Sequence, residues 1–194
     1  MTFRIGDKVV YPSQGPCLID AVVTKTIAGD PSSFYRLSLL DDKHDAVLVP
    51  VEKLRALHVR HLLAKSEIPK LLGHLEDSSL ASKNWKQRGI DNAKLLASGS
   101  AFDLAEIVQS LTELSGAKVL LPRDRQALEK ARKFLICEIS EVLAESRDAA
   151  EGQIDRALAS KGSLLKNSAD GGVGLPRRRR YIKYTRPALT SGGR

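Results

Sequence analysis

Short apolar runs separated by turn-forming residues fill residues 3–57. Such runs, broken at short intervals by Pro, Gly and Asp, are typical of strands in a small antiparallel barrel, and the segment is too short for a β-sandwich. The pattern therefore predicts strands at residues 3–5, 8–11, 17–23, 34–40 and 46–51.

After Leu57 the apolar spacing becomes that of helices. Asn84 and Ser100 are suitable N-cap residues, and Pro69 and Pro122 suit first helical turns, where a missing N–H costs little. We expect helices from about residue 68, from Trp85 to about Leu96, after Ser100, from Pro122 and over about 149–159, and we assign their apolar stripes to the core. The two main stripes are Leu104, Ile107, Val108, Leu111 and Leu114, and Leu128, Ala131, Leu135, Ile139 and Val142.

The pattern predicts an α+β protein with a barrel domain at residues 1–60, a compact all-α helical domain at 61–160 and a disordered basic tail at 161–194. The tail holds nine Lys or Arg and one Asp, so it carries the surplus behind the net charge of +8. Arg177–Arg180 with the nearby tyrosines suits non-specific contact with nucleic acid. A solubilising end that binds nothing explains the same composition.

Signatures of an enzyme are absent from the sequence, which has no phosphate-binding loop, GxSxG or HExxH motif. His58, His61 and His74 lack the Cys or acidic cluster that would favour a metal site over surface or partly buried histidines. We therefore expect no enzymatic activity and no cofactor or metal. Cys17 and Cys137 match no CxxC pattern and are interpreted as buried thiols, although a pairing is also compatible with the sequence.

The N-terminus has no apolar signal stretch, and no run approaches the length of a membrane span, so a cytoplasmic protein with no membrane contact is expected.

The only Trp, Trp85, lies among cations, with Lys86 and Arg88 close in sequence. A Trp usually anchors a core or a domain contact, so the residues alone favour packing. A surface ring that stacks on an unpaired base while the cations hold phosphates is the alternative.

Alternation along residues 46–51 places Leu48 on the opposite face from Val47 and Val49, so one of these faces points outward. If this strand forms a sheet rim, its apolar residues and Pro50 are candidates for docking a partner.

Seven segments carry a recognisable pattern in a fixed order. They are Phe3-x-Ile5-Gly6-Asp7-x-Val9-Val10-Tyr11-Pro12-x-x-Gly15, Phe34-Tyr35-x-Leu37, Val47-Leu48-Val49-Pro50, Asn84-Trp85-x-x-Arg88, Leu96-Ala97-Ser98-Gly99, Ala105-Glu106-Ile107-Val108-x-x-Leu111 and Ala131-Arg132-x-x-Leu135-Ile136. Over about residues 2–160 these segments resemble the CarD-like bacterial transcription regulators, the first three their polymerase-interacting domain and the last four their helical domain. The first motif alone also fits the related module of transcription-repair coupling factors, but their helicase motors are missing here.

The resemblance implies a Tudor-like β-barrel that binds the β subunit of bacterial RNA polymerase, followed by a helical bundle. It also implies that Trp85 wedges at the upstream edge of the melted promoter, near the −10 element, and stabilises the open complex, notably at ribosomal RNA promoters. The protein would act as a monomer. Implied polymerase contacts are Lys25, Arg36, Leu48 and Pro50, and implied DNA contacts are Trp85, Arg88, Lys86 and Lys94.

Two positions depart from the family pattern. Some relatives have Arg where Leu48 stands, which favours a hydrophobic contact over an electrostatic one here. Relatives often carry a further basic or aromatic pair where this chain has Gly89 and Ile90, so Lys86 and Lys94 are the candidates for phosphate contacts.

Overall fold

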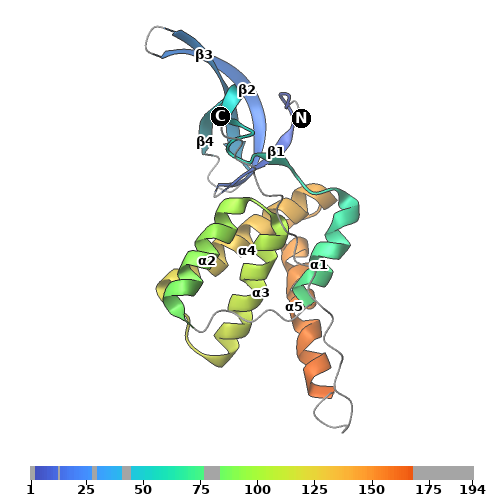
Figure 1. The fold of residues 1–194 in the computed structure, drawn as a ribbon. Coiled ribbons are helices and arrows are strands. Elements are labelled where there is room, and N and C mark those ends of the chain that lie inside the picture. The colour runs from blue at the N-terminus through green and yellow to red at the C-terminus, as the bar shows by residue number, and fades with distance from the viewer. Residues whose placement is uncertain (1–2, 13, 28–29, 41–44, 77–83, 168–194) are drawn as a thin grey trace, which may run out of the picture.

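The computed structural model describes residues 3–12, 14–27, 30–40, 45–76 and 84–167. Within these ranges an antiparallel sheet of five strands is followed by five α-helices (Figure 1). The predicted α+β class, with the strands first and the helices after them, is confirmed.

The sheet has the order β4-β3-β2-β1-β5, with every neighbouring pair antiparallel. A long β2–β3 hairpin extends away from the helices (Figure 1). The strands are β1 (Lys8–Tyr11), β2 (Gly15–Ile27), β3 (Asp30–Leu39), β4 (Ala46–Pro50) and β5 (Arg60–His61).

Two details of the strand prediction are wrong. The segment Phe3–Ile5 is not a strand, because the Asp7 N–H donates to the Arg4 carbonyl and the Arg4 N–H donates to the Asp7 carboxylate, which closes a turn. The sequence pattern does not predict strand β5, since two residues carry no alternation of apolar and polar positions. Because β5 pairs with β1, the sheet extends to His61, one residue past the predicted domain boundary.

One face of the sheet forms a small core. Val49 of β4 is 2% exposed and lies on this face with Leu37 of β3, while Leu48 points to the other face. The sequence expectation that Leu48 opposes Val47 and Val49 is therefore confirmed. The core also includes Phe3, Val9, Cys17, Ile19, Leu39, Leu54 and Val59.

The helices start where local signals place them. The Asn84 side chain accepts from the Lys86 N–H at 3.0 Å, and the Ser100 hydroxyl accepts from the Asp103 N–H at 3.4 Å. Helix α3 packs against α1, α2 and α4, and most residues of the two predicted stripes are buried in the core between these helices. Leu114, Leu128 and Val142 are only partly buried at its edge. The helices are α1 (Ile68–Glu76), α2 (Trp85–Ser98), α3 (Ala101–Ala117), α4 (Pro122–Leu143) and α5 (Arg147–Asn167).

Helix α5 is longer than the predicted 149–159, so the prediction of a disordered tail is wrong for residues 161–167. Leu164, Leu165 and Lys166 are good helix formers, and no proline follows before the helix ends. The rest of the predicted tail, 168–194, lies outside the described residues.

The sheet meets the helices at a junction centred on Arg60 of β5. Its guanidinium donates two hydrogen bonds, of 2.7 and 2.9 Å, to the carboxylate of Glu138 on α4, and a third, of 2.7 Å, to the Gly99 carbonyl between α2 and α3. Glu138 is 1% exposed and also accepts from the Leu63 N–H. Lys8 of β1 pairs with Glu141 one turn further along α4.

Two glycines, Gly15 and Gly99, allow the sheet and the helices to approach each other closely. A Cβ built on Gly15 would lie 2.6 Å from the Phe134 ring of α4, and one built on Gly99 would lie 2.9 Å from the Pro12 ring. Both glycines also have positive φ angles, 93° and 72°, which disfavour other residues. We call the contacts of Arg60, Glu138, Gly99 and Gly15 the junction.

Candidate functional site

Trp85 is a surface residue, so the packing role that the residues alone favoured is wrong. It is the first residue of α2, and its side chain is 55% exposed. The Asn84 cap and the hydrogen bond from the Arg88 N–H to the Asn84 carbonyl fix the backbone at this helix start. The Lys86 ammonium lies 5.6 Å from the centre of the Trp85 ring, so a cation accompanies the exposed ring.

Arg88 is placed differently from the sequence prediction. Its side chain is buried, and Nη2 lies 2.5 Å from Oδ2 of Asp124 in the first turn of α4, with Nε at 3.0 Å from the same oxygen. A guanidinium held in this way is not presented to a DNA phosphate. The predicted direct DNA contact of Arg88 is therefore corrected to a structural one, in which Arg88 holds α2 on α4.

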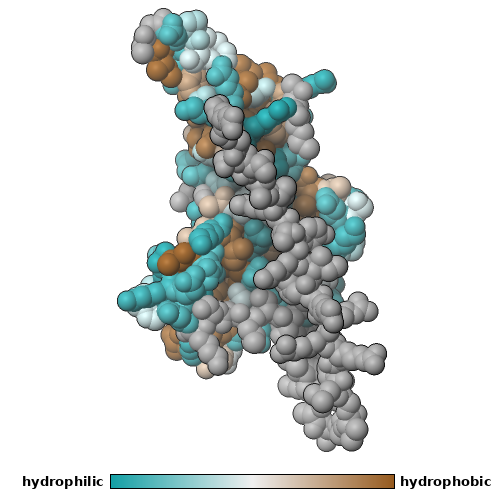
Figure 2. Space-filling model, in the orientation of Figure 1, coloured by the Kyte–Doolittle hydropathy of each residue, from teal (hydrophilic) through white to brown (hydrophobic). Residues whose placement is uncertain are grey.

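Lys86 and Lys94 lie on the exposed face of α2. They are eight residues apart, and the half-exposed Ile90 lies between them at the intermediate four-residue step. Residues at this spacing form one ridge along a helix. Figure 2 shows that the surface over α2 is mostly hydrophilic with an isolated apolar patch. This ridge can present two ammonium groups to a polyanion.

The four predicted polymerase-contacting residues share the outer face of the sheet. Arg36 pairs with Leu48, and Phe34, two residues before Arg36, pairs with Pro50. Lys25 pairs with Ser32 of β3. Ser32 and Arg36 are four residues apart in the same strand, so their side chains point to the same face, and Lys25 shares that face. We call Lys25, Arg36, Leu48 and Pro50 the outer-face group.

Sequence reasoning missed Asp20, which also belongs to this face. A β-bulge between Ile19 and Ala21 brings its carboxylate to 2.6 Å from Arg36 Nε, and the Ser38 hydroxyl donates to the other oxygen. The hydrogen bond from Arg36 lowers the pKa of Asp20 and raises the pKa of Arg36. The guanidinium is thereby oriented on the exposed face. No signal in the sequence marks this bulge.

A cavity of about 420 Å³ opens at the end of the outer face, where Pro50 leads into the short 3-10 helix Val51–Lys53. Phe34 and Pro50 form its apolar wall, with Ile27 and Pro31 from the hairpin. Leu48 precedes this cavity on β4. The outer-face group thus combines cations, an apolar strand edge and an adjacent hollow.

Two of the candidate histidines, His61 and His74, take part in ring contacts. His61 lies 4.9 Å from the Phe3 ring, and His74 packs edge-on against Phe102, with 5.9 Å between the ring centres. Within the described ranges, no group of three or more His, Cys, Asp or Glu side chains is placed to hold a metal ion.

Cys17 and Cys137 are both buried, and no disulfide joins these two described residues. The Cys17 thiol donates to the Gly15 carbonyl and the Cys137 thiol to the Leu40 carbonyl. No helix in the described part of the chain has the length and apolar character to cross a bilayer.

Comparison with known proteins gives family matches to both parts of the chain and a similar protein. Residues 3–63 match the family "CarD-like/TRCF RID domain" and residues 70–155 the family "CarD, C-terminal domain". The "Putative transcription factor YdeB" of Bacillus subtilis (strain 168) is 30% identical over 142 residues, which cover 71% of this chain and 90% of that protein.

A solved structure is also similar to part of the chain. The solution NMR structure of the 72-residue N-terminal domain of Myxococcus xanthus CarD is 35% identical, covers 31% of this chain and 79% of that one, and has a TM-score of 0.27.

Proposed function

This chain belongs to the CarD-like family of transcription regulators, and from that premise we propose that it binds the β subunit of bacterial RNA polymerase and stabilises the open promoter complex with Trp85. The observation that carries the proposal is the exposed ring of Trp85 on a capped helix start. In this proposal Trp85 wedges at the upstream edge of the melted DNA, near the −10 element, notably at ribosomal RNA promoters.

The outer-face group supports the docking half of the proposal. Four residues that the family resemblance implies as polymerase contacts come from three strands, and the sheet register gives them one common face. Leu48 stands opposite Arg36, so the contact would combine an apolar side chain with an oriented guanidinium. The cavity beside Pro50 offers space for a side chain of the partner.

The near-zero net charge of residues 1–160 explains why the protein would have to dock on polymerase before it contacts DNA. Outside the segment 161–194 the numbers of cationic and acidic residues are nearly equal, so the folded part neutralises few phosphates and has little DNA affinity of its own. Docking on polymerase raises the local concentration of Trp85 beside the promoter to the order of millimolar, the usual scale for linked sites. Lys86 and Lys94 then need to add only modest phosphate contacts.

The wedge favours melted DNA by differential binding. Inserting an aromatic ring into a duplex costs a few kcal/mol of unstacking, and much less at a junction that is already open. Because Trp85 would bind the open state better than the closed state, it would shift the population toward the open complex.

The wedge is tested with Trp85→Ala, measured as the lifetime of the open complex. We expect polymerase binding to be kept and the lifetime to shorten, because only the stacking surface is removed. Val119→Ala, which trims another exposed apolar side chain on the α3–α4 connection, is the matched control and should leave the lifetime unchanged. An unchanged lifetime for a folded Trp85→Ala protein would exclude the wedge role.

Docking is tested by capture of the isolated β-subunit lobe with the full chain. Leu48→Arg and Pro50→Ala should both weaken capture, since they alter the apolar part of the outer-face group. Val22→Arg is the control, because Val22 is exposed but pairs with Tyr35, which alternates to the opposite face. Full affinity in both outer-face variants would place the docking surface elsewhere.

A further inference from the structure

Helix α2 packs on the bundle through an unusual set of buried residues. Its buried positions are Arg88, Gly89 and Asn92, and none of them is a large apolar residue. The neighbouring helix α3 supplies six buried apolar residues to the core. The two leucines of α2 that touch this core, Leu95 and Leu96, lie in its C-terminal half and are only partly buried. The hydrophobic effect therefore holds the N-terminal half of α2 only weakly.

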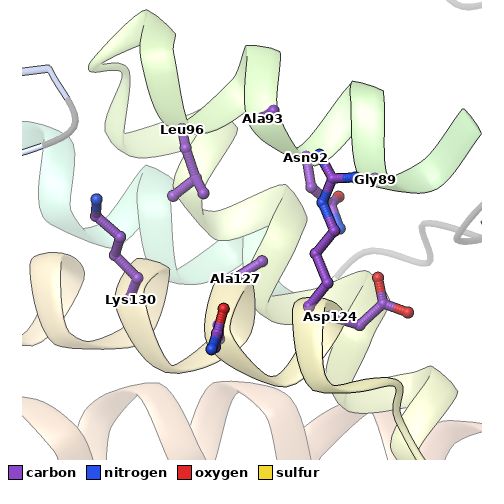
Figure 3. Close-up of a pocket in the computed structure, with 9 residues that line it drawn as sticks. Gly89, Asn92, Ala93, Leu96, Asp124, Ala127 and Lys130 are labelled. Carbon is purple, nitrogen blue, oxygen red and sulfur yellow. The ribbon is translucent and has the colours of Figure 1, made fainter. Parts of the chain in front are cut away.

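The space between α2 and α4 is incompletely filled. A cavity of about 200 Å³ lies there, and its lining includes Gly89, Ala93 and Leu96 of α2 with Ala127 of α4. Figure 3 shows Leu96 pointing toward α4 across this gap, near the small residues Gly89 and Ala93. Atoms that border a void lack partner atoms on that side, so the two helices gain less from dispersion at this contact.

A buried ion pair holds the N-terminal half of α2 instead. Arg88 donates from Nε and Nη2 to Oδ2 of Asp124 on α4, at 3.0 and 2.5 Å, and both side chains are almost fully buried. Asn92, one turn further along, has a buried Nδ2 group without a hydrogen-bond partner among the described residues. Separation of α2 from α4 would hydrate this amide, so Asn92 favours separation, and the ion pair has to offset that contribution.

The C-terminal end of α2 is anchored by different contacts. The carbonyl of Gly99, the C-cap residue, accepts the 2.7 Å hydrogen bond from Arg60 at the junction, and Gly99 lies against the Pro12 ring. These contacts do not involve the first turn of α4, so they can persist when Arg88 and Asp124 separate. Helix α2 therefore has a firmly held end at Gly99 and a weakly held end at Trp85.

We propose that residues 85–94 of α2 open from α4 as a unit while the rest of the bundle stays folded, and that the Arg88–Asp124 pair controls this opening. Proteins open in cooperative segments, and segments with few buried apolar contacts open at the lowest free energy. In the closed state, which the structure shows, Trp85 has a fixed position on the bundle. In the open state Asp124 and Asn92 are hydrated, and the Trp85 ring loses that position. The opening belongs to the chain by itself and does not depend on polymerase docking or on a DNA contact.

The direct test is native-state hydrogen exchange of the full chain, measured residue by residue by NMR at urea concentrations below the unfolding transition. After correction for intrinsic rates, we expect the amides of residues 89–94 to exchange at least about 100-fold faster than those of residues 105–111 in α3, with one shared and weaker dependence on urea. Equal rates and slopes in the two sets would mean that α2 opens only with the whole fold and would overturn the proposal. A gradual rise in protection from residue 89 to residue 94 would mean fraying of a helix end and would also overturn it.

Two variants separate the opening of α2 from global unfolding. Arg88→Ala leaves the Asp124 carboxylate buried without its partner while α2 is closed, so it should accelerate exchange of residues 89–94 by about a few hundredfold or more. Ile154→Val trims a fully buried side chain of α5, which packs on α1 and α4. It should accelerate exchange in α3 about 2- to 10-fold and leave α2 within about twofold, because α5 stays packed in the open state. Equal acceleration of α2 and α3 by Ile154→Val would contradict a separate opening.

The ion pair can also be replaced by apolar residues. In Arg88→Met/Asp124→Leu no charge remains buried at this contact, so exchange of residues 89–94 should be at least about tenfold slower than in Arg88→Ala. Exchange as fast as in Arg88→Ala would show that the pair does not control the opening and would refute that part of the proposal.

Discussion

The buried pair of Arg88 and Asp124 decides between two roles for Arg88, and its disruption gives a measurable difference. If Arg88 were a DNA contact, Arg88→Ala would lower DNA affinity and leave stability nearly unchanged. In the structure the side chains of both residues are almost fully buried, at 4% and 3% exposed, and joined by two hydrogen bonds to one carboxylate oxygen. Removal of either partner should therefore destabilise the fold.

The magnitude follows from the burial of both groups. Removing one partner of a buried pair leaves an uncompensated charge and costs about 3–5 kcal/mol. With an m-value of about 2 kcal/mol/M in urea, this lowers the unfolding midpoint by about 1.5–2.5 M. The same loss is a large part of the roughly 5–15 kcal/mol that stabilises a typical domain.

The assay is urea unfolding followed by helical circular dichroism, on Arg88→Ala and Asp124→Ala. The double variant Arg88→Met/Asp124→Leu should lose much less than the two single losses together, because no charge remains buried. Arg125→Ala, an exposed arginine in the same turn of α4 as Asp124, should change stability by no more than about 0.5 kcal/mol. The reasoning fails if Arg88→Ala costs less than about 1 kcal/mol and DNA affinity falls instead.

Four other outcomes are expected. Lys86→Gln and Lys94→Gln should each reduce the salt slope of DNA binding by up to about 0.9, as measured by titration at several salt concentrations; unchanged slopes would exclude phosphate contacts. The pKa of Asp20 is lowered by folding, so its stabilising effect is present above about pH 4 and is lost as the pH falls through its folded pKa; Asp20→Asn should flatten the melting-temperature profile below about pH 4. Gly99→Ala should destabilise the chain by about 1–3 kcal/mol in urea unfolding, because of its positive φ and the nearby proline ring; a neutral effect would mean that the junction yields easily. Truncation after Asn167 should leave open-complex stabilisation intact in the lifetime assay, whereas a protein that coats nucleic acid through its basic tail would lose its function.

Local signals predicted much of the fold. Asn84, Ser100 and Pro122 mark helix starts because capping and the missing proline N–H act within one turn. Alternation in β4 correctly separated Leu48 from Val47 and Val49, since the strand period is two residues. Only the structure shows that Val49 belongs to the core and that Leu48 therefore lies on the outer face.

Features that depend on distant partners could not be predicted. The burial of Arg88 is set by Asp124, which is 36 residues away. The outer-face role of Asp20 requires a bulge that carries no sequence signal. Residue type alone favours packing for Trp85, whereas at the start of α2 its ring is 55% exposed.

The junction centred on Arg60 has a mechanical consequence. Its hydrogen bonds tie β5 to α4 and to the start of α3, so the separation between the outer face and Trp85 becomes a property of the fold. If the outer face docks on polymerase as proposed, the fold sets a fixed distance between polymerase and the Trp85 ring. The open complex would then be stabilised less at promoters whose bubble edge lies at a different distance from the docking site. Weakening the junction would then change promoter choice while both contact surfaces stay intact.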